Sequence, residues 1–275
     1  TAIIDGWSPG ETYDLFIASH EGYGRLPDPV LHRRWVFHLK SNFWLVRDLA
    51  LGKRTHQLDI FWHLAPDLVA RESGAGGACC FARSEQPLNL LFLTRGDSDL
   101  IQELVLGSCS PAYGRQEPGP VLHLSTRTGL PAELSTLLVL TTRALDGNTL
   151  TRIRDDRIQA TVSAYRYDSL EGRHYMFFCD SSSPWKLADW SSDAQFLYIG
   201  LPADSEGTSV ILCNGSYASF QDRRMLNCGR SVARYEWSAR GQQAFCSDDS
   251  ALDAFAGEAA ARLREALDST ALERK

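Results

Sequence analysis

The densest group of chemically capable side chains lies near the start of the chain. His20 and Tyr23 are followed closely by His32 and Arg34. A guanidinium binds a carboxylate or sulfate through a planar fork, while imidazole and phenol groups donate hydrogen bonds and move protons. These four residues are therefore candidate substrate-binding residues for an acidic polymer. The alternative is a solvated outer face on which His20 and Tyr23 only fix a turn.

Period-two alternation predicts the strands that position this group. Residues 31–40 place His32, Arg34 and His38 on one face and apolar side chains on the other. After a short turn, residues 43–48 return antiparallel to them. Connections this short favour a meander with one face packed on a second layer.

A third strand is predicted at residues 57–64, again by alternation. Its polar face carries Asp59 and His63. If this strand continues the meander, both side chains lie near His32 and Arg34, on one surface of one sheet.

The rest of the chain repeats the same pattern, and Asn214 with the glycine after it predicts a hairpin turn. Many short strands without helices between them predict an all-β fold, an antiparallel, supersandwich-like β-sandwich over residues 1–248. Residues 249–275 change character, and from Ser250 they predict an amphipathic helix and a tail. We expect this helix to dock on the sandwich; binding a partner is the alternative. The further predicted strands are 88–94, 121–125, 135–142, 158–165, 174–179, 195–200, 209–214 and 232–237.

Composition excludes several functional classes. The 275 residues carry a net charge of −6, which argues against a broad nucleic-acid surface. No apolar run reaches the roughly 20 residues of a membrane span. The seven cysteines show no C-x-x-C spacing, H-E-x-x-H is absent, and the serines in residues 107–110 and 214–216 lack the G-x-S-x-G elbow and its α/β setting. The sequence thus predicts no metal ligands and no cofactor in this segment, with Cys179 and Cys213 as buried free thiols.

Among the aromatic residues, most tryptophans are expected to fill the core. Trp185 and Trp190 lie in a polar stretch and are the ones best placed to stack on a sugar.

The chain opens with Thr1 inside a predicted strand, without a visible signal peptide. We therefore expect a fragment of a longer polypeptide whose upstream part could hold the chemistry.

Several short segments in the first half of the chain carry a family resemblance. Together they resemble the C-terminal β-sheet domain of heparinase II/III-like polysaccharide lyases. The segments are His20-Glu21-Gly22-Tyr23 through His32-Arg33-Arg34, Trp44-Leu45-Val46-Arg47-Asp48, Trp62-His63-Leu64-Ala65-Pro66 and Ser110-Pro111-Ala112-Tyr113-Gly114.

The resemblance implies an upstream α-helical toroid and cleavage of acidic, uronate-containing polysaccharide, such as a glycosaminoglycan or alginate, by β-elimination. It also implies a periplasmic or secreted location. In such enzymes the principal Tyr, His and Asn belong to the toroid and to H-x-H-x-D and A-H-N-T segments, none of which occurs here. We therefore assign no catalytic residue to this chain, and any structural divalent metal of the family would have its ligands upstream.

Two functions follow from these observations. In the first, the chain is the β-sandwich portion of such a lyase, contributes one wall of the substrate cleft and is inactive alone. The alternative is a non-enzymatic carbohydrate-binding or assembly module in a surface-polysaccharide system.

Overall fold

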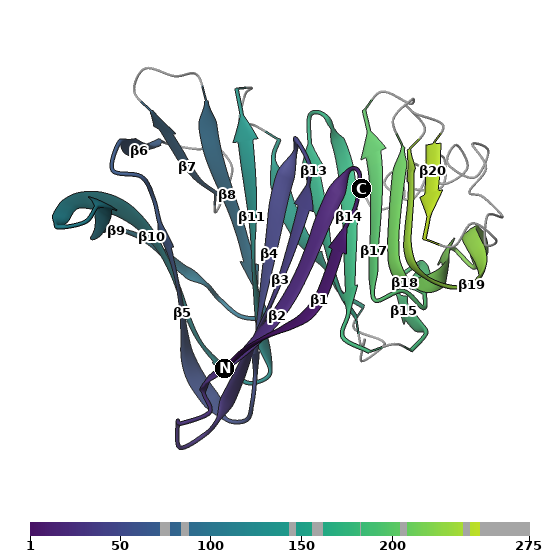
Figure 1. Cartoon of the computed structure of the whole chain (residues 1–275), viewed down its shortest axis with the longest axis horizontal. Helices are drawn as coiled ribbons and strands as arrows, with labels where there is room; N and C mark the ends of the chain where they lie inside the picture. Colours follow the sequence, from purple (N-terminus) through teal and green to yellow (C-terminus); the bar gives the residue numbers. More distant parts are fainter. Residues whose placement is uncertain are drawn as a thin grey trace. The chain divides into compact units, whose positions relative to one another are not determined.

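The computed structural model describes residues 1–71, 78–83, 88–142, 147–155, 162–181, 183–203, 208–238 and 243–247. Every regular element in these residues is a β-strand, and every strand pair is antiparallel. The predicted all-β fold class is thus confirmed. The described part of the chain contains no helix that could span a membrane. Two compact units, Thr1–Asp146 and Gly147–Lys275, divide the chain (Figure 1).

Unit 1 is built on an eight-stranded sheet in the order β1-β2-β3-β4-β11-β8-β7-β6. Along β3, His32 and Arg34 share one face while Trp35 and Phe37 are buried on the other. This alternation is the one the sequence predicts, because successive side chains of a strand point to opposite faces. The strands are β1 (Ala2–Pro9), β2 (Tyr13–Tyr23), β3 (Val30–Leu39), β4 (Phe43–Leu51), β6 (Leu68–Arg71), β7 (Ala78–Arg83), β8 (Asn89–Gly96) and β11 (Ala132–Thr141).

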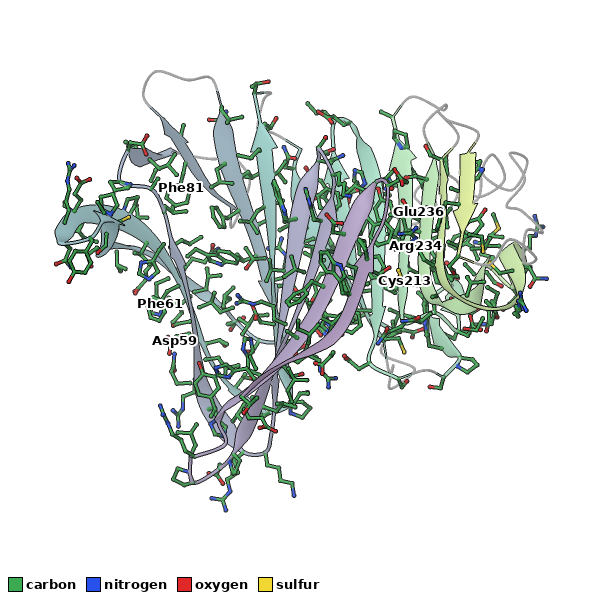
Figure 2. All side chains as sticks on the ribbon, viewed as in Figure 1. Asp59, Phe61, Phe81, Cys213, Arg234 and Glu236 are labelled. Carbon is green, nitrogen blue, oxygen red and sulfur yellow. The ribbon has the colours of Figure 1, made fainter. Side chains whose placement is uncertain are left out.

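A second, three-stranded sheet of unit 1 has the order β5-β10-β9, with β5 (Thr55–His63), β9 (Ile101–Ala112) and β10 (Arg115–Gly129). Its apolar face packs on the larger sheet through Leu122 and Leu124, which meet Phe81 and Phe92. Figure 2 labels Phe81 in this core and Phe61 on β5. Phe61 is 54% exposed, so β5 has one apolar inner face and one outer face.

The two sheets of unit 1 are joined at one end by two short connections. Residues 52–54 link β4 to β5, and residues 130–131 link β10 to β11 (Figure 1). The Leu130 N–H donates to the Arg54 carbonyl at 2.7 Å, so the connections are also hydrogen-bonded to each other. A side chain at Gly52 would meet the Pro29 carbonyl at 3.0 Å, which shows how closely this end is packed.

This arrangement corrects the predicted meander. β5 does not continue the first sheet: it pairs with β10, whereas β4 takes β11 as its second neighbour. The reason is burial, because Ile60 and Trp62 cover the core between the two sheets only if β5 crosses to the second layer.

Unit 2 is a nine-stranded sheet in the order β12-β13-β14-β17-β18-β16-β15, with β19 beside β18 and β20 beside β19. One face carries an aromatic core in which Phe177, fully buried, stacks on Trp185 and contacts Trp190, both with ring centroids at 5.2 Å. The strands are β12 (Thr149–Ile153), β13 (Val162–Ser169), β14 (Gly172–Cys179), β15 (Trp185–Leu187), β16 (Trp190–Ser192), β17 (Phe196–Pro202), β18 (Ser209–Phe220), β19 (Arg223–Ser238) and β20 (Gln243–Cys246).

Two sequence-based expectations in unit 2 are wrong. Trp185 and Trp190 are 4% and 3% exposed, because the β15–β16 hairpin lays them on the sheet, and neither can stack on a sugar. Asn214 does not turn the chain: β18 continues through it, and Asn214 takes φ 51° just before the register with β19 shifts between Gly215 and Tyr217. Asn tolerates the left-handed conformation at a bulge as well as in a hairpin.

Two further predictions concern the cysteines and the C-terminal residues. Cys179 and Cys213 are buried free thiols, as predicted. The predicted helix and tail at 249–275 lie outside the described residues, so the boundary at residue 248 stays a prediction.

Candidate functional site

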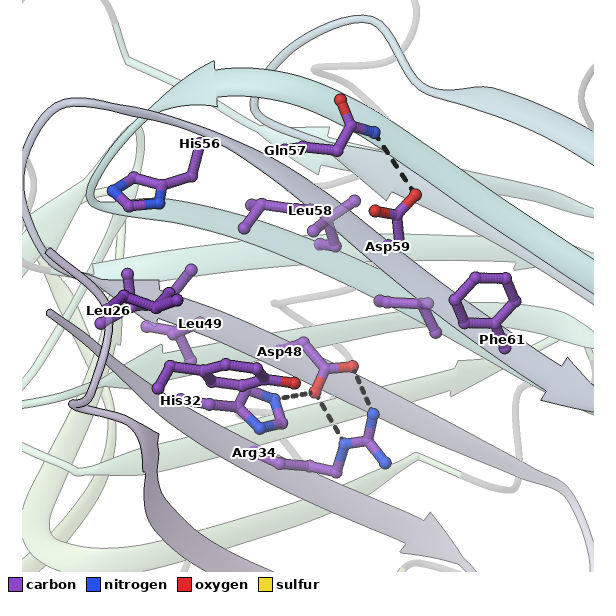
Figure 3. Close-up of a pocket in the computed structure, with 15 residues that line it drawn as sticks. Leu26, His32, Arg34, Asp48, Leu49, His56, Gln57, Leu58, Asp59 and Phe61 are labelled. Atoms are coloured by element: carbon purple, nitrogen blue, oxygen red, sulfur yellow. Dashed lines mark hydrogen bonds and ion pairs between the residues drawn. The ribbon is translucent and has the colours of Figure 1, made fainter. Parts of the chain in front are cut away.

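A cavity of about 480 Å³ lies in unit 1 between β3–β4 and β5. One wall carries His32, Arg34 and Asp48, and the other carries Gln57 and Asp59 (Figure 3). Tyr23, Leu26 and Phe61 complete the rim, with Val30, Leu49, Ala50, His56, Leu58, Ile60 and Leu134 as the remaining lining residues. A mostly apolar hollow with a few convergent polar groups is the usual form of a small-ligand site.

Asp48 organises the first wall. Its side chain is 6% exposed and lies directly across from Arg34 in the β3–β4 register. Arg34 Nε donates to Oδ1 at 2.7 Å and Nη2 to Oδ2 at 3.0 Å, while His32 Nε2 lies 2.6 Å from Oδ1 (Figure 3). This nearly buried carboxylate therefore fixes both side chains through charge-assisted hydrogen bonds.

The fixed side chains keep polar atoms that no described residue uses. Arg34 is 40% exposed, and its Nη1 has no partner among the described residues. His32 is 31% exposed and uses only Nε2 on Asp48, so Nδ1 stays available. The wall can thus offer a guanidinium N–H and an imidazole nitrogen to a ligand, both already oriented.

The opposite wall belongs to β5. Asp59 accepts from Gln57 Nε2 at 3.3 Å and pairs with His123 Nε2 at 2.8 Å. His123 also stacks on Phe61, with ring centroids 4.4 Å apart. Among the described strands β5 pairs only with β10, so its second edge presents backbone N–H and C=O groups that no strand uses.

The four predicted binding residues come together at one end of this cavity. Tyr23, His32 and Arg34 line it. His20 is not a lining residue, but its ring centroid lies 5.4 Å from that of Tyr23 and 6.1 Å from that of His32. The Gly22 N–H donates to His20 Nδ1 at 3.1 Å where the register of β2 with β3 shifts, so His20 also holds the backbone of β2 at this irregularity.

The polar surface predicted for a single sheet is only partly right. Asp59 does share the cavity with His32 and Arg34, although it comes from the other sheet. His38 does not line the cavity: it stacks on Trp44 at 4.4 Å, and His63 is not a lining residue either. Among the described residues, no group of three or more His, Cys, Asp or Glu side chains could hold a metal ion.

Sequence reasoning missed Asp48. The hairpin that pairs Leu39 with Phe43 necessarily pairs Arg34 with Asp48, so the register alone could have identified this acid as the partner of the arginine. The signal was present as the one carboxylate in a strand whose other side chains, apart from Arg47, are apolar.

Unit 2 contains a buried histidine of a different kind. His174 Nδ1 shares a hydrogen bond of 2.9 Å with the Tyr198 hydroxyl, and its ring stacks on Tyr167. Burial lowers the pKa of His174 to about 4, against a small opposing effect of Asp168. His174 is therefore neutral at physiological pH and serves packing, not proton transfer.

Comparison with known proteins gives a consistent result. Residues 5–154 match the family model "Heparinase II/III-like, C-terminal", whereas no curated protein matches. Among solved structures, heparan sulfate lyase HepC from Pedobacter heparinus superposes with a TM-score of 0.50 at 15% identity, over 60% of this chain and 26% of that one. A heparinase III structure gives 0.53 at 14% identity, over 65% and 27%.

These structures share the fold with this chain, which spans only about a quarter of their length. The family model, in contrast, covers more than half of the chain and includes all four predicted binding residues together with Asp48. The resemblance seen in the sequence is thus confirmed, and the chain belongs to the heparinase II/III-like C-terminal family.

Proposed function

We propose that this chain is the C-terminal β-sandwich portion of a lyase that cleaves acidic, uronate-containing polysaccharide by β-elimination. It contributes one wall of the substrate cleft through the cavity of unit 1, and an upstream α-helical domain supplies the main catalytic groups. Such an enzyme meets its substrate in the periplasm or outside the cell. Any structural divalent metal has its ligands in the upstream part.

The observation that carries this proposal is the Asp48-centred wall in a domain of this family. Arg34 and His32 are held by a carboxylate that is 6% exposed, yet Arg34 keeps a guanidinium N–H and His32 keeps its Nδ1 atom for a ligand. A preoriented guanidinium is suited to a uronate carboxylate or a sulfate, because its planar fork matches their oxygens.

The reaction assigns distinct tasks to the two parts. β-Elimination removes the C5 proton of a uronate, breaks the C4–O glycosidic bond, forms the C4–C5 double bond and protonates the leaving oxygen. Positive charge near the carboxylate stabilises the intermediate that forms when the C5 proton leaves. Arg34 and His32 bind and orient the polymer, whereas proton removal and protonation fall to the upstream groups.

The experiment compares the 275-residue chain with the same chain joined to its upstream coding sequence. Both are mixed with uronic-acid polymers, and the ultraviolet absorbance of the unsaturated product is followed. Product is expected from the joined protein alone. Product from the isolated chain would overturn the division of labour, and binding without product from either protein would favour a non-enzymatic carbohydrate-binding module.

A variant then tests the cavity itself. Arg34→Gln in the joined protein is expected to raise KM about tenfold, as loss of one charge-assisted contact implies. Arg115→Gln is the matched control, since Arg115 is 70% exposed and pairs only with Glu117 away from the cavity. Equal effects of the two variants on KM would show that the cavity does not bind the substrate.

A further inference from the structure

Unit 2 contains a second group of oriented cationic side chains. Arg166 Nε donates to Asp168 Oδ2 at 2.6 Å, and Arg173 Nε donates to Asp168 Oδ1 at 2.9 Å. One carboxylate thus fixes two guanidiniums, each through its inner N–H. The three side chains carry one net positive charge.

Hydroxyl groups border this cluster on the same face of the sheet. The strand register pairs Thr149 with Asp168 and Thr151 with Arg166, and directly paired residues of antiparallel strands share a face. Both threonines are exposed. The same register argument places Arg173 beside Asp168 on the next strand.

The outer N–H groups of the arginines remain open to a ligand. Arg166 is 42% exposed, and its Nη atoms have no partner among the described residues. Arg173 is 29% exposed, and Asp168 holds it through the Nε contact. Because the Nε contacts already order both side chains, little of their rotamer entropy remains to be lost on binding.

We propose that Arg166 and Arg173, with Thr149 and Thr151, form an anion-binding site for the sulfate or carboxylate groups of an acidic polysaccharide. The choice of a polysaccharide rests on the proposed function, whereas the anion chemistry rests on the geometry alone. The site shares no residue with the cavity of unit 1, and the family match ends at residue 154, before both arginines.

The competing interpretation is a surface salt bridge that only ties β13 to β14. The variant Asp168→Asn distinguishes the two interpretations. It makes the cluster more positive, so attraction that depends only on charge would strengthen. A built site loses the carboxylate that orients its arginines, so anion binding weakens although the charge rises.

The test is calorimetric titration of the full 275-residue chain with a short heparin oligosaccharide at low salt. Arg166→Gln combined with Arg173→Gln is expected to weaken binding at least about tenfold, as loss of a charged fork implies. Asp168→Asn weakens it in the same direction, and Arg115→Gln, which also removes one exposed charge, leaves it nearly unchanged. Tighter binding by Asp168→Asn, or equal loss in the Arg115 control, would overturn the site.

Two further measurements need no variant. Titration with a hyaluronan oligosaccharide, which carries carboxylates but no sulfate, shows whether carboxylates alone suffice. Binding of neither polymer overturns the site, and binding of either supports it only together with the arginine signals described next, because the cavity of unit 1 can also bind such a polymer. In NMR spectra with sodium sulfate, the Nε–Hε signals of Arg166 and Arg173 should shift while that of Arg115 stays. Stationary signals would contradict the proposal. Since neither readout involves turnover, an absence of lyase activity would refute only the proposed function.

Discussion

Asp48 in unit 1 and Asp168 in unit 2 each hold two side chains in place, in very different surroundings. Asp48 bonds to His32 and Arg34, and Asp168 accepts hydrogen bonds from Arg166 and Arg173. Asp48 is 6% exposed at the wall of a cavity, whereas Asp168 is 24% exposed at the margin of an aromatic core. Water can replace the partners of Asp168 far more easily, so the two carboxylates orient arginines alike but differ in what they contribute to stability.

The hydrophobic cores of the two units also differ in how they are packed. Unit 1 divides its strands between two sheets and leaves a hollow with polar walls. Unit 2 covers one face of a single sheet with stacked aromatic rings. We therefore expect unit 2 to respond most to losses of volume and unit 1 to losses of charge pairing.

The largest expected effect is at Phe177. Phe177→Ala should lower the free energy of unfolding by about 4 kcal/mol, because it removes a fully buried ring and leaves a cavity. Phe61→Ala, at a ring that is 54% exposed, should cost less than about 1 kcal/mol. Urea unfolding followed by tryptophan fluorescence measures both, and similar costs would contradict the packing difference.

The pH dependence of stability comes next. The pKa of His174 is about 4 in the folded chain and 6.5 in the unfolded one. Between these values only the unfolded chain takes up the proton, so stability is complete above pH 6.5 and falls by up to about 3 kcal/mol as the pH drops to 4. His174→Gln should flatten this part of the plot of unfolding free energy against pH, while His56→Gln, at a partly exposed site, should not. An unaltered slope in His174→Gln would assign the effect elsewhere.

Asp48→Asn should have an intermediate effect. It removes charge-assisted bonds to His32 and Arg34, and Arg34 can rehydrate because it is 40% exposed, so we expect a loss of about 2 kcal/mol. Asp222→Asn is the control, since Asp222 is 84% exposed in its pair with Lys186. Thermal unfolding at neutral pH measures the melting temperatures of both variants. If both melt at the temperature of the parent chain, the expected effect of Asp48 is contradicted.

The smallest effect belongs to Asp168→Asn. We expect less than about 1 kcal/mol of destabilisation, because surface ion pairs contribute little. Anion binding should nevertheless weaken in this variant. A loss of stability as large as that of Asp48→Asn would show that exposure does not distinguish the two carboxylates.

The sequence predicts most strands of this fold, because alternation reports which face of each strand is buried. It predicts the face that His32 and Arg34 share for the same reason. The sheet to which β5 belongs could not be obtained this way, since Ile60 and Trp62 would alternate identically in either layer. Trp185 and Trp190 were misjudged because their neighbours in the sequence are polar, whereas their burial comes from a sheet surface distant along the chain.

The paired connections at residues 52–54 and 130–131 determine how the cavity can adapt. Both walls are tethered at that end, where the Leu130–Arg54 hydrogen bond ties the tethers together. These connections therefore hold the two sheets of unit 1 at a fixed spacing at this end. Ile60 and Trp62 on β5 also pack into the core shared with the larger sheet, so a bound sugar has to fit the width that these contacts leave.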